Sequence, residues 1–140
     1  MKKSLLNNQI RGYIEWELIH YHEDKRQLTE CKNSFIPSGI ANYDLDAGGR
    51  SGVGNPTEKA AIKIVSNPYI RTLEIKIAAI DRVLAKCDKT DLKIIELVYW
   101  RETHNLTGAA MVCFISKSGA YDRINKIINN IALEMGIINY

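Results

Sequence analysis

The sequence has little cysteine and little proline, and both shortages restrict its class. The 140 residues include three cysteines, Cys31, Cys87 and Cys113, which are far apart and form no CxxC pair. An odd number of widely spaced cysteines argues against a disulfide framework and against a zinc finger. Cys87 and Cys113 have apolar sequence neighbours, so we expect them to be buried thiols in a reduced protein.

Long apolar runs are also missing. The chain starts with Met1-Lys2-Lys3, but Asn7, Asn8 and Arg11 interrupt the segment that follows. A signal peptide needs an uninterrupted apolar region, and a membrane span needs a still longer one. The sequence therefore predicts a cytoplasmic protein with no membrane partner.

An excess of charge of one sign is absent as well. Nineteen Lys and Arg stand against 16 Asp and Glu, a net charge of +3, and 46% of the residues are hydrophobic. Such a composition supports a globular core. The mildly basic balance is compatible with nucleic acid as a partner without requiring it.

Catalytic and metal-binding patterns are missing too. His20, His22 and Glu23 are close in sequence, but residues two apart on a helix point to different faces and cannot share an ion without distortion. His104 is isolated in a predicted turn. Since no nucleophile or carboxylate has a partner at catalytic spacing, we predict no enzyme, no cofactor and no metal.

What the chain does have is helical periodicity. Residues 4–33 contain no proline and one glycine, and apolar residues recur there every three or four positions. This pattern predicts a long N-terminal helix within residues 1–36. Glycine-rich residues 37–56 follow and predict a flexible linker, because small and polar composition disfavours packing.

Residues 57–87 carry the most regular pattern. A short helix is expected from Thr57 to Ser66, and Asn67-Pro68 then interrupts it. A heptad seam follows, formed by Ile70, Leu73, Ile77, Ile80, Leu84 and Cys87. Such a seam can close against the N-terminal helix of the same chain as a hairpin, or against a second copy as a coiled coil.

Residues 88–140 predict three further helices. The first is capped by Asp88 or Thr90 and ends near Arg101. The second spans about residues 107–114, and the third runs from Ser116 to about Gly136. With no alternating strand pattern anywhere, the fold class is all-α.

Within this block, residues 106–128 match the requirements of a helix-turn-helix. Ala109 and Ala110 supply small residues where two helices cross, and Ile115 is expected to enter the core before the Ser116 cap. Ala120 and Ile124 are predicted to face inward. The exposed N-terminal side of the last helix then faces the major groove of DNA.

The residues predicted to contact DNA surround this helix start. They are Ser116, Lys117, Ser118, Gly119, Tyr121, Asp122, Arg123 and Lys126. Lys117 and Lys126 suit phosphates, and Arg123 suits either a phosphate or guanine. Phe114 departs from the motif, because a turn in the left-handed conformation favours glycine.

Several blocks in order along the chain give it a resemblance to a known family. Residues 11–18, 20–25, 55–58, 67–71, 96–100, 116–118, 121 and 123–127 are similar to those of the RinA-type phage late transcriptional activators. The resemblance implies a C-terminal part like region 4 of sigma-70 factors, and activation of phage or prophage late genes. It also implies promoter DNA and host RNA polymerase as partners, and DNA contacts at Ser116, Lys117, Ser118, Tyr121, Arg123 and Lys126.

The sequence leaves three readings of function. The first is a DNA-binding transcriptional activator, either as a monomer or as a homodimer. The second is a protein like the small terminases, which join a helix-turn-helix to an oligomerising segment and mark viral DNA for packaging. The third is a helical adaptor that binds no DNA.

Overall fold

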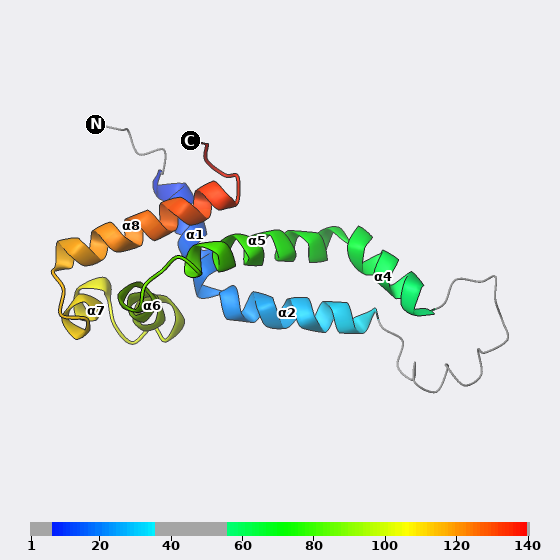
Figure 1. Cartoon of the computed structure of the whole chain (residues 1–140), viewed down its shortest axis with the longest axis horizontal. Helices are drawn as coiled ribbons and strands as arrows, with labels where there is room; N and C mark the ends of the chain where they lie inside the picture. Colours follow the sequence, from blue (N-terminus) through cyan, green and yellow to red (C-terminus); the bar gives the residue numbers. More distant parts are fainter. Residues whose placement is uncertain (1–6, 36–55, 140) are drawn as a thin grey trace. The chain divides into compact units, whose positions relative to one another are not determined.

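The computed structural model of the chain describes residues 7–35 and 56–139, and every regular element within them is helical. The all-α fold class is therefore confirmed. Along the chain the elements are α1 (Asn8–Ile19), α2 (Tyr21–Ser34), α4 (Pro56–Ser66), α5 (Pro68–Leu84), α6 (Lys89–Ile95), the π-helix η1 (Glu96–Trp100), α7 (Leu106–Val112) and α8 (Lys117–Glu134) (Figure 1). None of these helices is both long and apolar enough to cross a membrane. The predicted linker, residues 37–56, lies almost entirely outside the described residues.

The predicted long N-terminal helix is instead two helices, α1 and α2, which are separated at His20. Side-chain donors join the backbone bonding at this point, where the His20 N–H still bonds to the Trp16 carbonyl oxygen at 3.1 Å. The Nδ1 atom of His20 lies 2.7 Å from the Trp16 carbonyl oxygen, to which it donates. The Trp100 indole donates to the Leu18 carbonyl oxygen over 3.1 Å. Since that second donor comes from η1, the break depends on tertiary packing and has no local sequence signal.

The described chain divides into two compact units, of which the larger comprises residues 1–22 and 75–140. Its core is built from aliphatic side chains of α1, α5, α6 and α8. The most deeply buried are Ile14, Leu18, Ile80, Ile94, Ile95, Ile124, Ile128 and Ile131. These are the residues that the three-to-four spacing places on one face of each helix, so burial of the apolar stripes accounts for the packing.

One charged side chain lies within this core. Glu17 of α1 is 0% exposed, and its carboxylate forms an ion pair with the Lys76 ammonium at 2.8 Å. The Lys76 ammonium also lies 5.8 Å from the centre of the Tyr13 ring. Hydrogen bonding to Glu17 is the main factor that raises the pKa of Lys76. A buried carboxylate tolerates this position only with its partner in place.

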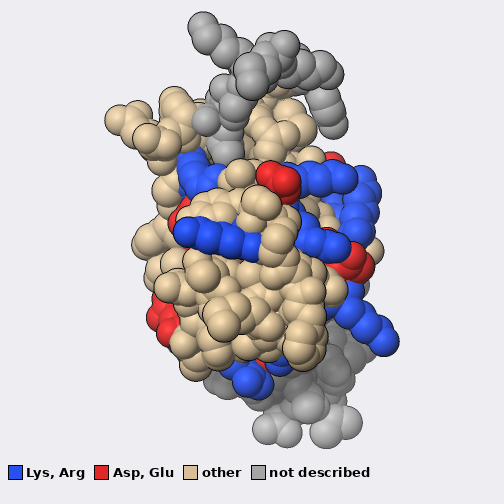
Figure 2. All heavy atoms as spheres, turned by 90° about the vertical axis from the view of Figure 1, so that its left-hand side faces the viewer, with Lys and Arg blue, Asp and Glu red and all other residues tan. Residues whose placement is uncertain are grey.

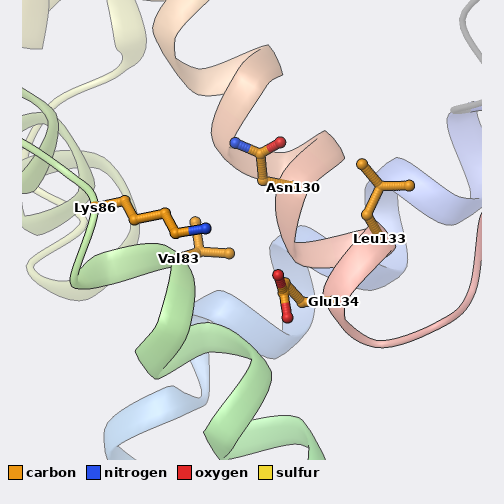
Figure 3. A pocket seen from close by; sticks show the side chains of 5 residues that line it. All are labelled: Val83, Lys86, Asn130, Leu133 and Glu134. Atoms are coloured by element: carbon orange, nitrogen blue, oxygen red, sulfur yellow. The ribbon is translucent and has the colours of Figure 1, made fainter. Parts of the chain in front are cut away.

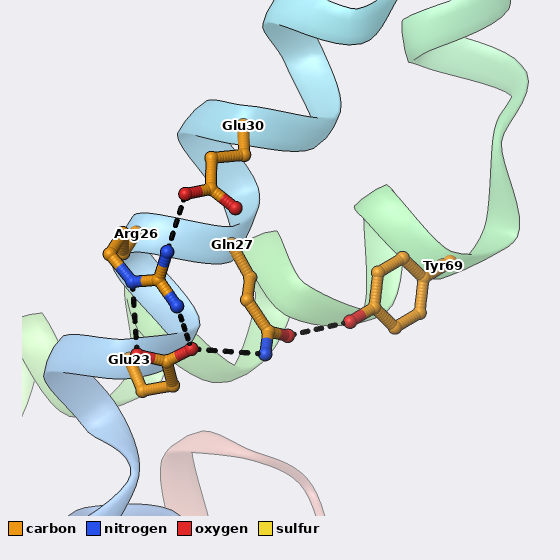
Figure 4. Close-up of polar contacts among 5 residues, drawn as sticks. All are labelled: Glu23, Arg26, Gln27, Glu30 and Tyr69. Atoms are coloured by element: carbon orange, nitrogen blue, oxygen red, sulfur yellow. Dashed lines mark hydrogen bonds and ion pairs between the residues drawn. The ribbon is translucent and has the colours of Figure 1, made fainter.

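The smaller unit, residues 23–74, contains most of α2, all of α4 and the start of α5. The Tyr69 hydroxyl donates to Gln27 over 2.8 Å, and Lys32 pairs with Glu74 at 2.8 Å, so both contacts join α2 to α5. Along α2, Arg26 contacts Glu23 and Glu30 (Figure 4). The polar side chains therefore fix the register of these two helices.

The interruption at Asn67-Pro68 is confirmed. The Asn67 side chain accepts hydrogen bonds from the backbone N–H groups of Tyr69 (2.9 Å) and Ile70 (3.1 Å), so it caps α5. Heptad residues Ile70, Leu73, Ile77 and Ile80 are all buried within the single chain. A second copy is not required to cover them.

Candidate nucleic-acid interface

The segment that supports the candidate site begins with α6. Of the two predicted caps, Asp88 is the one that caps α6. Its carboxylate accepts a hydrogen bond from the Asp91 backbone N–H at 2.8 Å. The Asp91 carboxylate in turn accepts one from the Asp88 backbone N–H at 3.4 Å. α6 continues into the π-helix η1, where the Arg101 N–H bonds to the Glu96 carbonyl oxygen at 2.7 Å. This continuous element ends near Arg101, as predicted.

α7 is the first of the two helices predicted to form the motif. Asn105 caps it by accepting from the Gly108 N–H over 2.8 Å. Ala109 and Ala110 are buried, as expected of small residues at a helix crossing. α7 packs against α8, and the crossing at Ala109 and Ala110 stays a prediction.

The turn after α7 has a left-handed residue at Phe114, with φ of 58°. The Phe114 N–H bonds to the Met111 carbonyl oxygen at 3.2 Å, and the Ile115 N–H bonds to the Ala110 carbonyl oxygen at 3.0 Å. These two bonds form a Schellman motif, which usually has glycine at the left-handed position. The turn therefore has the expected geometry despite its unusual residue. Ile115 is half-buried rather than fully inserted into the core.

α8 starts as predicted. The Ser116 hydroxyl accepts from the Gly119 N–H at 3.0 Å, and Ala120 and Ile124 face the core. A Cβ on residue 119 would lie 2.9 Å from the Ser116 oxygen. Gly119 is thus explained by the cap, because any larger residue would crowd the hydroxyl that closes the helix start.

Most of the predicted contact residues are exposed on this helix start. They are Ser116, Lys117, Ser118, Tyr121, Asp122 and Lys126, while Gly119 is half-buried. The Lys117 ammonium lies 5.9 Å from the centre of the Tyr121 ring. Neither Lys117 nor Lys126 has an ion-pair partner among the described residues, so both are available to an anionic ligand.

Arg123 has a different environment from the other predicted contacts. One guanidinium nitrogen lies 2.9 Å from the carboxylate of Asp88 and 2.9 Å from that of Asp91, so it bridges α8 to the capping box of α6. The hydrogen bond to Asp88 is the main factor that raises the pKa of Arg123. The pKa of Asp88 is lowered mainly by the hydrogen bond from the Asp91 backbone, and to a smaller extent by the hydrogen bond from Arg123. A base-reading role for Arg123 stays a prediction. To contact a base, Arg123 would have to give up its bonds to Asp88 and Asp91.

Two features of the surface were missed by sequence reasoning. Arg11 of α1 donates to Asn125 of α8 and pairs with Glu15 at 2.9 Å, so α1 supports the helix beside Lys126. The other feature is the exposure of Met111 and Phe114 beside the helix start. The departure of Phe114 from glycine was the only sequence signal for it.

Figure 2 shows the end of the molecule at which α7 and the first turn of α8 lie (Figure 1). Lys and Arg side chains, with several Asp and Glu side chains among them, border a broad area without charged side chains. Between Thr103 and Tyr121 the sequence has no Asp or Glu at all. This face therefore combines exposed cations with apolar surface, and the exposed carboxylates of Glu102 and Asp122 flank it in the sequence.

A pocket of about 110 Å³ is lined by Val83, Lys86, Asn130, Leu133 and Glu134 (Figure 3). Pockets that hold small molecules are commonly about 300–1,000 Å³. In the described part of the chain, no three or more His, Cys, Asp or Glu side chains are grouped to hold a metal ion.

The cysteines differ from prediction in their burial. Cys87 and Cys113 are half-buried, not fully buried, because each lies at or just beyond the end of a helix. The Cys87 thiol donates to the Val83 carbonyl oxygen over 3.3 Å, and burial is the main factor that raises its pKa to about 11. It is therefore a protonated, unreactive thiol at neutral pH.

A scan against models of protein families, a search of curated proteins and a search of solved structures each return no match to this chain.

Proposed function

We propose that this chain binds double-stranded DNA through α7 and α8 and regulates transcription. The observation that carries the proposal is the capped start of α8, which presents Lys117, Ser118 and Tyr121 to solvent while Ala120 and Ile124 anchor the helix in the core. A helix held in this way can enter the major groove with its first turns against base edges and phosphates. The backbone N–H groups of a helix start favour a phosphate as well.

The contacts divide into two kinds. Lys117 and Lys126 are unpaired cations that would neutralise phosphates and set the affinity. Ser118 and Tyr121 are neutral donors that would fix register or address a base edge. Arg123 would act first by holding α8 against α6, since its guanidinium bonds to Asp88 and Asp91.

The biological role within this proposal rests on the resemblance to the RinA-type activators. In this role the chain would act in the cytoplasm of a bacterial host and activate phage or prophage late genes. It would bind promoter DNA and engage host RNA polymerase, with a homodimer as a further possibility. It would be a binding protein, not an enzyme, and would need no cofactor.

The test is capture of fragments of the source genome on the purified chain at moderate salt, followed by sequencing. The proposal expects one short site upstream of a late operon to be enriched by the wild type and lost in a Lys117→Glu/Lys126→Glu variant. Lys63→Glu is the matched control, because Lys63 is an exposed lysine on α4. Circular dichroism checks that all variants keep the helical content of the wild type.

Salt dependence sharpens the same experiment. If Lys117 neutralises a phosphate, Lys117→Gln should reduce the slope of log K against log salt by about 1. Lys63→Gln should leave that slope unchanged. Enrichment inside a terminase gene would favour a packaging role instead. No enrichment, even with RNA polymerase added, would refute DNA binding and leave a helical adaptor.

A further inference from the structure

Phe114 is the most exposed large apolar side chain beside the candidate interface. It is 96% exposed, and Met111, whose carbonyl accepts its backbone N–H, is 73% exposed. Val112 is exposed as well. Three apolar side chains therefore face solvent within four residues, at the point where the chain turns into α8.

The exposed Phe114 also has an unfavourable backbone conformation, with φ of 58°. A left-handed conformation is unfavourable for a residue with a Cβ. The same hydrogen-bond pattern closes α8, and there the left-handed residue is Gly136, with φ of 74°. Phe114 adopts this unfavourable conformation although its ring is not buried inside the chain. Strained residues of this kind are concentrated at functional sites, so the ring is expected to contact something outside the chain.

The surroundings of Phe114 favour nucleic acid as that partner. Lys117 and the hydroxyls of Ser116 and Ser118 follow it directly, and the sequence has no acidic residue from Thr103 to Tyr121. A polyanion complements a surface of this charge. On a base edge in the major groove, the only apolar group is the C5-methyl of thymine, and phenylalanine is among the residues that contact it.

We propose that Phe114, supported by Met111, packs against the methyl group of a thymine in the DNA that α8 binds. This inference rests on the proposed function and adds a base preference to it. The site would then contain at least one required thymine beside the phosphates that Lys117 contacts. Phe114 would recognise this thymine through an apolar contact with its methyl group and not through a hydrogen bond.

Replacing thymine by uracil tests the contact directly, because uracil lacks only the methyl group. Affinities are measured for the captured site and for duplexes in which each thymine in turn is uracil. The wild type should lose about fourfold at one or two positions, equivalent to the ~0.8 kcal/mol of one buried methyl group. Phe114→Ala should bind the thymine and uracil duplexes equally at those positions.

Lys63→Gln is the control, because Lys63 is an exposed residue outside α7 and α8 and the variant keeps the ring. It should retain the sensitivity to uracil. Thermal unfolding of Phe114→Ala should match the wild type, since the exposed ring supports no packing. A wild type that binds no site would refute the proposed function itself.

Two outcomes would overturn this inference while leaving DNA binding intact. One is a wild type that is indifferent to uracil at every thymine, or a Phe114→Ala variant that keeps the sensitivity. The other is a Phe114→Ala variant that binds DNA like the wild type but fails to activate transcription with RNA polymerase. That second result would assign the exposed ring to a protein partner.

Discussion

Two Schellman motifs among the described residues provide a matched test of what Phe114 costs. Both end a helix with the same pair of backbone hydrogen bonds, and both place one residue in the left-handed region. One motif uses Phe114 and the other Gly136. Exchanging the residue type at each position should therefore change the free energy of unfolding in opposite directions.

The expected magnitude for Phe114→Gly follows from three terms. Relief of the left-handed conformation is worth about 1–2 kcal/mol. The extra conformational freedom of glycine in the unfolded chain lowers the stability of the folded state by about 0.5–1 kcal/mol. Loss of packing is small, because the Phe114 ring is almost fully exposed. The net is a stabilisation of about 0–1.5 kcal/mol, and its centre of ~0.75 kcal/mol corresponds to a rise in Tm of roughly 3–6 °C for a domain of this size.

The opposite exchange, Gly136→Ala, should destabilise by about 1 kcal/mol. No atom lies within 4 Å of a Cβ built on Gly136, so the loss would come from the backbone conformation and not from a clash. Phe114→Ala keeps the left-handed cost and should leave stability near the wild-type value.

Urea denaturation followed by circular dichroism measures these changes, with a shift in the midpoint at unchanged m-value as the expected signature. The reasoning would be refuted if Phe114→Gly lost stability while Gly136→Ala lost about 1 kcal/mol. In that case the ring would contribute contacts within the chain that the structure does not show. If the ring contacts DNA, Phe114→Gly should also be the variant that is more stable yet binds its site less tightly.

Three further predictions concern the core and the caps. Lys76→Met should destabilise by about 3–5 kcal/mol in urea denaturation, because it strands the buried Glu17 carboxylate, and Glu17→Leu/Lys76→Met should recover most of the loss. Because the folded pKa of Asp88 lies below its ordinary value of 3.8, its contribution is present above that pH and disappears as the pH falls through the folded pKa. An acid titration of stability should therefore be shallower for Asp88→Asn, which caps without titrating. Gly119→Ala should cost stability in the wild type, where it disturbs the Ser116 cap, but should add up to about 1 kcal/mol in a Ser116→Ala background, where only helix propensity remains. Equal effects of Gly119→Ala in both backgrounds would contradict the cap explanation.

Much of the fold could be predicted from the sequence because the signals are local. Apolar spacing assigned the helices, and the Ser116 cap and the pair Ala109-Ala110 located the helix crossing and the start of α8. Each of these depends on residues within a turn or two of one another. The same holds for Asn67, whose side chain caps the helix that begins directly after it.

Other features depend on residues that are distant in the sequence, and these were not predicted. The break at His20 involves the Trp100 indole, and the position of Arg123 is set by Asp88 and Asp91. In both cases a side chain satisfies a group on a helix that packing alone brings near. Periodicity assigns residues to a face of a helix, but it does not tell which helix that face will meet.

The candidate site shows the same division. The sequence by itself determined which residues stand at the start of α8 and that Phe114 occupies a position suited to glycine. Only the tertiary structure decided that Lys117 and Lys126 remain unpaired, that Arg123 is engaged by α6, and that the Phe114 ring is left in solvent. The physical reason is that identity and spacing follow from the covalent chain, whereas pairing and exposure depend on what the other helices bring within reach.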